Sequence, residues 1–246
     1  MQTACYHRLM DAKRCAVGLA LGKRLEHIPQ SGPYHACLTE SQKAQLFGSK
    51  PVPHDVGCGT FACVYPVGDR VVKITRDRED ADAMVAAQGI AGVAKVYGAH
   101  ELRQAGTDDR TGKPVDLYAL EVERLKPLPE NVRRDLNPAL QVLRRGLLNY
   151  AQAYKGPPSA LSLPALPAMA RAACRKASGV GACQRLLEDV GEAFVDMAKI
   201  GIVWQDIHAR NIALDKQGHA KVIDLGFSGA KRVEIPALAG PGRQRP

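Results

Sequence analysis

The hydrophobic positions before residue 50 follow a helical spacing. Between residues 7 and 25, apolar side chains recur among basic ones at intervals typical of a helix. Residues 39–47 then open with Thr39 and Gln42 in the T-x-x-Q order of a capping box, and this segment stops at Gly48. We therefore predict two short helices and assign residues 1–50 to a helical N-terminal extension.

After residue 50 the spacing changes to the alternation of a β-sheet. Residues 52–67 and 70–75 are rich in β-branched side chains at every second position, and the pair Gly68-Asp69 between them strongly favours a turn. Residues 77–88 consist largely of helix formers, with acidic side chains in the first turn, where the helix dipole favours them. The pattern predicts a β-hairpin followed by a helix.

Two more strands and two longer helices are expected further along the chain. Strand-like runs occupy residues 94–102 and 115–123, with a polar loop between them. A helix near 130–152 is separated by a proline-rich linker from a second helix that begins near residue 168. The second helix carries apolar residues at helical spacing, which predicts that they are buried: Leu186, Leu187, Val190, Phe194, Met197 and Ile200.

Composition agrees with an ordered globular protein. Of the 246 residues, 46% are hydrophobic and 24% are charged, which is enough to bury one or two modest cores. A membrane-spanning helix needs about 18 consecutive apolar residues, and no run in the chain approaches that length. We therefore expect no membrane span.

The cysteine pattern bears on the cellular compartment. The seven cysteines are odd in number, scattered and without a C-x-x-C pair, which argues against a disulfide framework and favours a reducing compartment, by default the cytoplasm. Free thiols are expected rather than a zinc site, because standard zinc motifs use other spacings. The residues that such a zinc site would use are Cys5, His7, Cys15, His35 and Cys37.

The net charge of +9 is concentrated in the middle of the chain. Residues 124–185 contain eleven basic and two acidic residues, an excess equal to that of the whole protein. Such a segment can bind an acidic protein or RNA, or it can form a solvated helical face. Only 5% of the residues are aromatic, which argues against recognition of RNA by base stacking.

The pattern most informative about chemistry lies between residues 201 and 228. Asp206 and Asn211 stand in the order D-x-x-x-x-N after a helix, and two short strands around a turn then lead to Asp224-Leu225-Gly226. Phosphoryl transfer from ATP needs one carboxylate to orient the acceptor hydroxyl, and an amide and a second carboxylate to hold magnesium. The ordered spacing contains all three groups, although each residue alone is common in turns.

With this pattern the chain resembles the protein-kinase-like superfamily, whose members also carry a glycine-rich loop and a strand lysine upstream. Residues 57–64 have the form G-x-G-x-x-A-x-V, and Lys73 follows after a tight turn. The resemblance implies an α+β, bilobal protein-kinase-like fold with a small antiparallel β N-lobe and a reduced, mainly helical C-lobe. ATP would lie in the cleft between the lobes.

The resemblance also implies roles for individual residues. Asp206 would orient the acceptor hydroxyl, Lys73 would contact the α- and β-phosphates, and Asn211 and Asp224 would bind Mg²⁺. The acid that holds Lys73 would be Glu79, with Asp82 on the same helical face as the alternative. The remaining ATP-binding residues would be Gly57, Gly59, Ala62 and Val64 in the glycine-rich loop, and Glu123 and Leu125, which would offer backbone groups to adenine.

Other features of the motifs bear on the acceptor. The usual H-R-D tripeptide is Trp204-Gln205-Asp206, so regulation through a phosphorylated activation loop is not expected. His208 makes the loop D-I-H-x-x-N, similar to aminoglycoside and choline kinases, whereas I-D-L-G-F-S around Asp224 is similar to small atypical kinases that act with tRNA-modification complexes. We expect transfer of the γ-phosphate to a protein serine or threonine hydroxyl. The alternatives are a small-molecule kinase and a non-catalytic kinase-fold binding module.

The expected domain organisation follows from these assignments. The kinase N-lobe would span residues 51–123, and the reduced C-lobe residues 124–230, with the basic, proline-containing insertion at 130–185. Only 22 residues follow Asp224, so the lower helices of an ordinary protein kinase are not expected. Residues 231–246 form a basic tail outside the resemblance.

Overall fold

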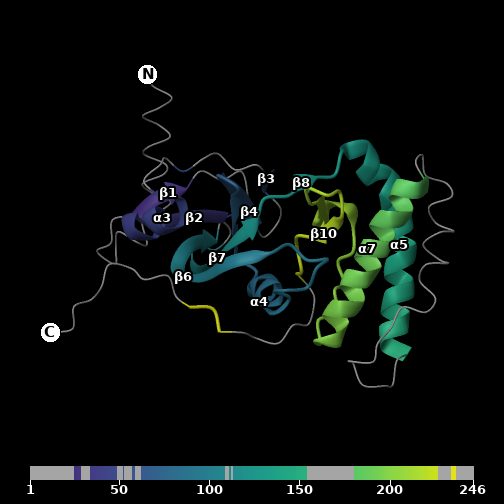
Figure 1. Ribbon diagram of the computed structural model, residues 1–246. Coiled ribbons are helices and arrows are strands. Elements are labelled where there is room, and N and C mark those ends of the chain that lie inside the picture. The colour runs from purple at the N-terminus through teal and green to yellow at the C-terminus, as the bar shows by residue number, and fades with distance from the viewer. Residues whose placement is uncertain are drawn as a thin grey trace. The chain divides into compact units, whose positions relative to one another are not determined.

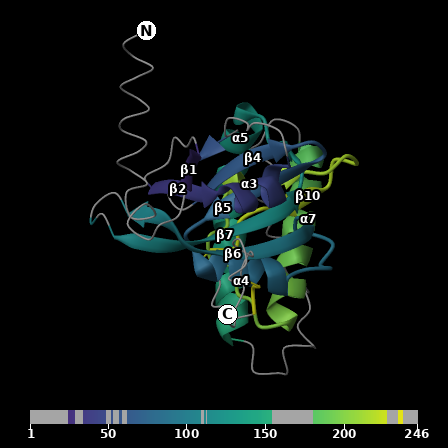
Figure 2. The same ribbon diagram turned by 90° about the vertical axis from the view of Figure 1, so that its left-hand side faces the viewer.

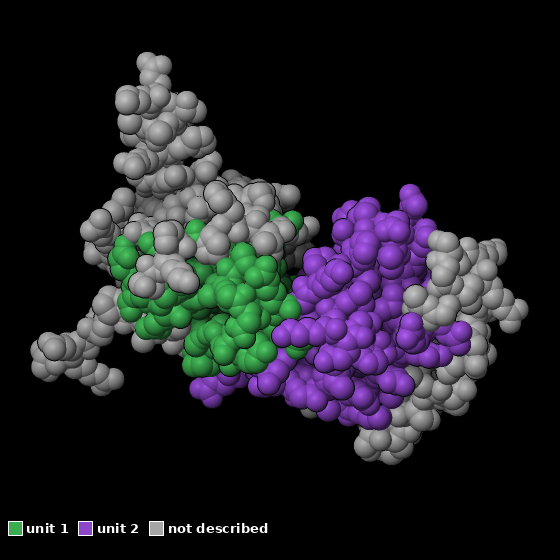
Figure 3. Space-filling model, turned by 45° about the horizontal axis from the view of Figure 1, so that its top comes forward, with its two compact units in different colours: residues 1–78, 97–124, 235–246 green, residues 79–96, 125–234 purple. Residues whose placement is uncertain are grey.

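The computed structural model describes residues 25–28, 34–48, 52, 57–58, 62–108, 111, 113–153, 180–226 and 234–236. Within these residues the protein is of the α+β class, with antiparallel strand pairs and four α-helices (Figure 1). The chain divides into two compact units, coloured separately in Figure 3. The first unit contains residues 1–78, 97–124 and 235–246, and the second contains residues 79–96 and 125–234.

The first unit is built on a seven-stranded sheet with the strand order β1-β2-β6-β7-β5-β4-β3. Figure 2 shows β6, β7, β5 and β4 following one another in this order. The strands are β1 (Leu25–Ile28), β2 (Tyr34–Thr39), β3 (Gly57–Cys58), β4 (Ala62–Val67), β5 (Arg70–Thr75), β6 (Val96–Asp108) and β7 (Pro114–Glu123).

A short helix, α3 (Glu40–Phe47), contributes to the core of this unit. Its start is a capping box: the Thr39 hydroxyl accepts a hydrogen bond from the Gln42 N–H at 3.2 Å, and Gln42 Oε1 accepts one from the Thr39 N–H at 3.0 Å. The helix packs its apolar end against alternate residues of β4 and β5. The core cluster includes Leu46, Phe47, Cys63, Tyr65, Val72 and Ile74.

The N-terminal region confirms one expected helix and adds two strands. The helix at residues 39–47 is present as α3. Strands β1 and β2 were not expected, so the extension is not wholly helical. Sequence periodicity missed them because β2 forms by pairing with β6, whose partner residues 106–108 are about seventy positions away in the chain. Of the helix expected at residues 7–25, all but Leu25 lies outside the described residues.

The second unit is mainly helical and contains a small sheet. Its helices are α4 (Arg78–Ala86, of which Arg78 belongs to the first unit), α5 (Glu130–Ala153) and α7 (Val180–Lys199), and its sheet has the order β10-β9-β8. The strands are β8 (Lys126–Pro127), β9 (Ile212–Leu214) and β10 (Ala220–Val222). Helices α5 and α7 lie side by side, and each buries an apolar stripe (Figure 1).

The outer edge of β10 is covered by residues 92–94, which connect α4 to β6. The Ala94 N–H donates to the Val222 carbonyl at 2.8 Å, and the Val222 N–H donates to the Gly92 carbonyl at 2.9 Å. Only glycine fits at position 92, because an added Cβ would lie 2.4 Å from the Cβ of Ala193 on α7. The edge strand is therefore paired rather than left open.

Most of the other expected elements are present close to their expected positions. The β4–β5 hairpin turns at Gly68 and Asp69, and α4, β6, β7, α5 and the β9–β10 hairpin are all found. The apolar residues expected to be buried on α7 are buried, with one exception. Ile200 is 53% exposed, because α7 ends at Lys199 and Gly201 adopts a φ of +86°, which turns the chain away.

The expectation of free thiols is wrong at three positions. Cys58 and Cys63 are joined by a disulfide, and Cys183 is disulfide-bonded as well. Cys58 and Cys63 face each other in the register of β3 and β4, so the bond depends on a strand pairing that cysteine spacing does not reveal. The cytoplasmic location stays a prediction.

None of the helices among the described residues combines the length and the apolar character needed to cross a membrane.

Candidate functional site

Asp206 lies in the segment 202–208, which joins α7 to the short 3-10 helix η2 (Ala209–Asn211) and has no helical or strand structure. Its carboxylate is held by Asn211, whose Nδ2 donates to Asp206 Oδ2 and to the Asp206 backbone carbonyl, each at 3.0 Å. The Asn211 side chain is buried, whereas 45% of the Asp206 side chain is exposed. The predicted pair is thus in direct contact, with the carboxylate accessible.

His208 lies close to the same carboxylate oxygen of Asp206. Its Nδ1 accepts a hydrogen bond from the Arg210 N–H at 3.2 Å, and its Nε2 lies 3.2 Å from Asp206 Oδ2. Asp206 Oδ2 therefore accepts a hydrogen bond from Asn211 and lies close to the imidazole, whereas Oδ1 receives no hydrogen bond from the described residues.

The β9–β10 hairpin brings the backbone just before Asp224 next to the backbone of Asn211. Val222 pairs with Ile212, and the Ile223 N–H donates to the Asn211 carbonyl at 3.0 Å. The turn is closed by Asp215 Oδ1, which accepts from the backbone N–H groups of Gln217 and His219, each at 2.9 Å. Asp224 therefore follows directly after the residue that is paired with Asn211, as the spacing predicted.

The segment Asp224-Leu225-Gly226 is held by two carboxylates. Asp224 Oδ1 accepts from the Gly226 N–H at 3.1 Å, and Asp80 Oδ1 accepts from the Leu225 N–H at 2.9 Å. Asp80 lies on α4 and is only 2% exposed. Asp80 was not among the predicted site residues, because within Glu79-Asp80-Ala81-Asp82 no local signal tells which acids turn inward.

In the first unit, the expected phosphate-binding residues share one row of the sheet. Gly57 pairs with Val64, Val64 pairs with Lys73, and Lys73 pairs with Leu120. Residues paired in this way point to the same face, and Ala62 lies on that face two positions from Val64. This face is opposite to the one that α3 covers, whose residues are Cys63, Tyr65, Val72 and Ile74.

Lys73 is buried, with 5% of its surface exposed. Of the acids on α4, Glu79 is half-buried and Asp82 is buried. The pairing of Lys73 with Glu79 or with Asp82 stays a prediction. Gly59 lies outside the described residues.

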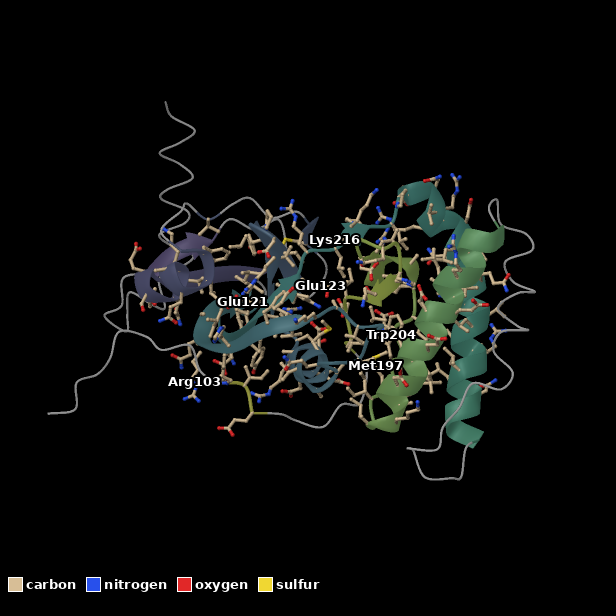
Figure 4. All side chains as sticks on the ribbon, in the orientation of Figure 1. Arg103, Glu121, Glu123, Met197, Trp204 and Lys216 are labelled. Carbon is tan, nitrogen blue, oxygen red and sulfur yellow. A yellow bond between two sulfur atoms is a disulfide. The ribbon has the colours of Figure 1, made fainter. Side chains whose placement is uncertain are left out.

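The expected adenine-binding segment begins where β7 ends. Glu123 is the last residue of β7 (Figure 4), and the division between the two units falls between Arg124 and Leu125. Arg124 Nη1 donates to the Gly68 carbonyl at 3.0 Å, which ties the end of β7 to the β4–β5 turn. The role of Glu123 and Leu125 in binding a base stays a prediction.

The donor chemistry at Asn211 and Asp224 fits magnesium. Because Nδ2 of Asn211 donates to Asp206, its oxygen Oδ1 is the atom available as a ligand, and Asp224 adds carboxylate oxygens. Two protein ligands suit Mg²⁺, because phosphate oxygens and water commonly complete its coordination shell. In the described part of the chain no three His, Cys, Asp or Glu side chains gather as a metal site of their own. The zinc ligands considered above fall largely outside that part.

Trp204, the first residue of the Trp204-Gln205-Asp206 tripeptide, is completely buried. Its indole Nε1 has no hydrogen-bond partner among the described residues. The side chain therefore anchors the 202–208 segment by packing alone.

Some basic residues of the segment 124–185 form ion pairs or hydrogen bonds within the second unit. Arg133 contacts Glu130 at 3.0 Å, Arg134 contacts Asp135 at 3.6 Å, and Arg144 donates to the Gln205 carbonyl at 2.6 Å. Lys155 and the basic residues at 171–176 lie outside the described residues. Binding of an acidic protein or RNA by this segment stays a prediction.

The chain matches no protein-family model and no curated protein. The functional argument therefore depends on its own residues and their geometry.

Proposed function

We propose that this protein is a magnesium-dependent phosphotransferase with a bilobal protein-kinase-like fold, which transfers the γ-phosphate of ATP to a serine or threonine hydroxyl of a protein. The observation that carries the proposal is the arrangement in the second unit. Asp206 is held by Asn211 and His208, and the β9–β10 hairpin brings Asp224 next to the residue paired with Asn211.

In this proposal Asp206 receives the acceptor hydroxyl. The oxygen Oδ2 accepts from Asn211 and lies 3.2 Å from His208 Nε2, so Oδ1 is the atom that would accept the hydroxyl proton and direct the oxygen towards phosphorus. These contacts also fix the carboxylate orientation, which reduces the freedom that would otherwise be lost in the transition state.

Asn211 Oδ1 and the Asp224 carboxylate would hold Mg²⁺. The ion, when bound, neutralises negative charge on the transferring phosphoryl group. The hydrogen bonds from Gly226 to Asp224 and from Leu225 to Asp80 keep this turn in one conformation, so the Asp224 carboxylate is positioned before the ligand arrives.

Lys73 and the glycine-rich segment would bind the phosphates. The Lys73 ammonium carries a positive charge, and a phosphate oxygen is an acceptor suited to that charge. Gly57, Ala62 and Val64 lie on the row and face that carry Lys73. The backbone at Glu123 and Leu125 would bind adenine.

The proposal is tested by intact-protein mass spectrometry after incubation of the full chain with Mg²⁺ and ATP, alone and with a mixed protein acceptor. Asp206→Asn keeps the shape of the side chain but cannot take up a proton at neutral pH, so the transfer rate should fall about 10³-fold while ATP binding is retained. Asp196→Ala, a change at an exposed surface acid, is the control. Equal transfer by Asp206→Asn and the parent would refute the assignment, and transfer to small alcohols but not to protein would favour a small-molecule kinase.

A further inference from the structure

The backbone around Asp206 requires partners from outside its own segment. Residues 202–208 form neither helix nor strand, so their N–H and C=O groups are not satisfied by a regular ladder. Polar backbone groups that are removed from water without partners are costly. One such partner comes from α5, and α5 also supplies the acceptor for the first N–H of η2.

Arg144 and Asn137 of α5 contact the chain on the two sides of Asp206. Arg144 Nε donates to the carbonyl of Gln205, the residue before Asp206, at 2.6 Å. Asn137 Oδ1 accepts from the N–H of Ala209, three residues after Asp206, at 2.9 Å. The two contacts therefore enclose the Asp206-Ile207-His208 stretch.

The spacing of Asn137 and Arg144 along α5 allows both side chains to reach the segment around Asp206. They are seven residues apart, which places them on the same face of a helix, two turns from each other. The same side of α5 carries Leu136, Leu140, Leu143 and Leu147, which are almost fully buried. The helix that carries the contacts is thus fixed by the core, and the hydrogen bond from the charged guanidinium is of the stronger kind.

We propose that Asn137 and Arg144 are positioning residues, which hold the segment around Asp206 so that its carboxylate has one orientation towards the acceptor. This inference rests on the proposed phosphotransfer. Neither residue touches the reacting atoms. Losing either contact lets the segment shift, and a misplacement of about 1 Å can lower a catalytic rate about 100-fold.

The experiment compares Asn137→Ala and Arg144→Met with two matched controls in the full chain. Asn149→Ala and Arg145→Met make similar chemical changes at exposed positions of the same helix. We expect kcat to fall about 10- to 100-fold in the two test variants with KM for ATP changed less than about twofold, because Lys73 and Asp224 are untouched. Both controls should stay within about twofold of the parent.

The conservative variant Asn137→Asp separates positioning from packing. It keeps an oxygen acceptor for the Ala209 N–H, so it should retain kcat within about threefold of the parent. A loss as large as that of Asn137→Ala would overturn the role of the acceptor. Test variants that match the controls in kcat would overturn the whole proposal. If Asn137→Ala does not fold, Asn137→Leu removes the same hydrogen bond while keeping the volume and is measured instead.

Hydrogen exchange of the Ala209 amide distinguishes this proposal from the proposed function. If the parent transfers no phosphate, the proposed function fails, and exchange still reports whether α5 holds the segment. Faster exchange at Ala209 in Asn137→Ala than in Asn149→Ala supports the contact. Equal exchange in the two variants overturns it.

Discussion

Asp206 shows how neighbouring side chains turn a common residue into a candidate for catalysis. Aspartates are frequent in loops, where they usually bind backbone N–H groups or water. Here Asn211 donates to one oxygen, which His208 also contacts, and the other oxygen receives no hydrogen bond from the described residues. Asp215 is a useful contrast within the same unit, because its Oδ1 closes the β9–β10 turn through two backbone N–H groups. The same residue type thus has a structural function at one position and suits a chemical one at the other.

A second residue, Asp80, should stabilise the protein through one buried hydrogen bond. Asp80→Ala leaves the Leu225 N–H buried without its acceptor, which should lower the free energy of unfolding by about 1–3 kcal/mol. Asp80→Asn keeps an acceptor oxygen and should lose less. Urea denaturation measures both, with Asp69→Ala in the exposed β4–β5 turn as the control. If Asp80→Ala and Asp69→Ala have the same stability, the contact contributes nothing.

At the scale of elements, the start of α3 is the clearest case in which sequence and structure agree. Thr39 and Gln42 form the reciprocal bonds of a capping box, and α3 contributes Leu46 and Phe47 to the core of the first unit. The T-x-x-Q pattern could be recognised in advance because all of its contacts lie within four residues. Local patterns of this kind do not depend on the rest of the fold.

Removing this cap should weaken the first unit. Thr39→Ala deletes the acceptor for the Gln42 N–H, and loss of an N-cap typically costs about 0.5–2 kcal/mol. Thermal denaturation followed by circular dichroism should show a lower midpoint. Thr39→Ser keeps the hydroxyl and is expected to remain close to the parent. A serine variant as unstable as the alanine variant would point to lost packing of the methyl group instead.

The contact between residues 92–94 and α7 depends on the absence of a side chain at Gly92. Gly92→Ala would place a Cβ at 2.4 Å from the Cβ of Ala193, and overpacking of this kind costs about 1–3 kcal/mol. The second change Ala193→Gly removes the obstructing atom. We therefore expect the double variant to be more stable than the sum of the two single effects predicts, as measured in a double-mutant cycle. Strict additivity would show that the two residues are not in contact.

At the scale of the whole molecule, the proposed binding of magnesium and ATP can be measured as a change in stability. Lys73 belongs to the first unit, and Asn211 and Asp224 belong to the second. A ligand that binds only the native protein stabilises it by about 2.7 kcal/mol when its concentration is 100 times the dissociation constant. Magnesium and ATP together should therefore raise the melting temperature of the full chain, and AMP should raise it less.

The variants Lys73→Met and Asp224→Asn should each reduce this ligand-induced shift, the first through the phosphates and the second through magnesium. Lys216→Met changes an exposed lysine in the β9–β10 turn and serves as the control. Because each shift is measured against the same variant without ligand, changes in basal stability do not enter. A full shift in Asp224→Asn would contradict its assignment as a metal ligand.

The sequence by itself determined the features that depend on neighbours in the chain. The α3 capping box, the Gly68-Asp69 turn and the β9–β10 hairpin with Asp206, Asn211 and Asp224 all follow from local spacing, because turn and helix preferences act over a few residues. Most of the helices and strands followed from the same periodicities, whereas the α+β class was expected from the resemblance.

Only the tertiary structure decided which distant residues meet. Strand β2 exists through pairing with β6, the Cys58–Cys63 bond through the register of β3 and β4, and the contact of Asp80 with Leu225 through the packing of α4. The contacts of Asn137 and Arg144 on the two sides of Asp206 were likewise decided by the tertiary structure. In each case the deciding free energy comes from burial and hydrogen bonding between segments that sequence periodicity treats as independent.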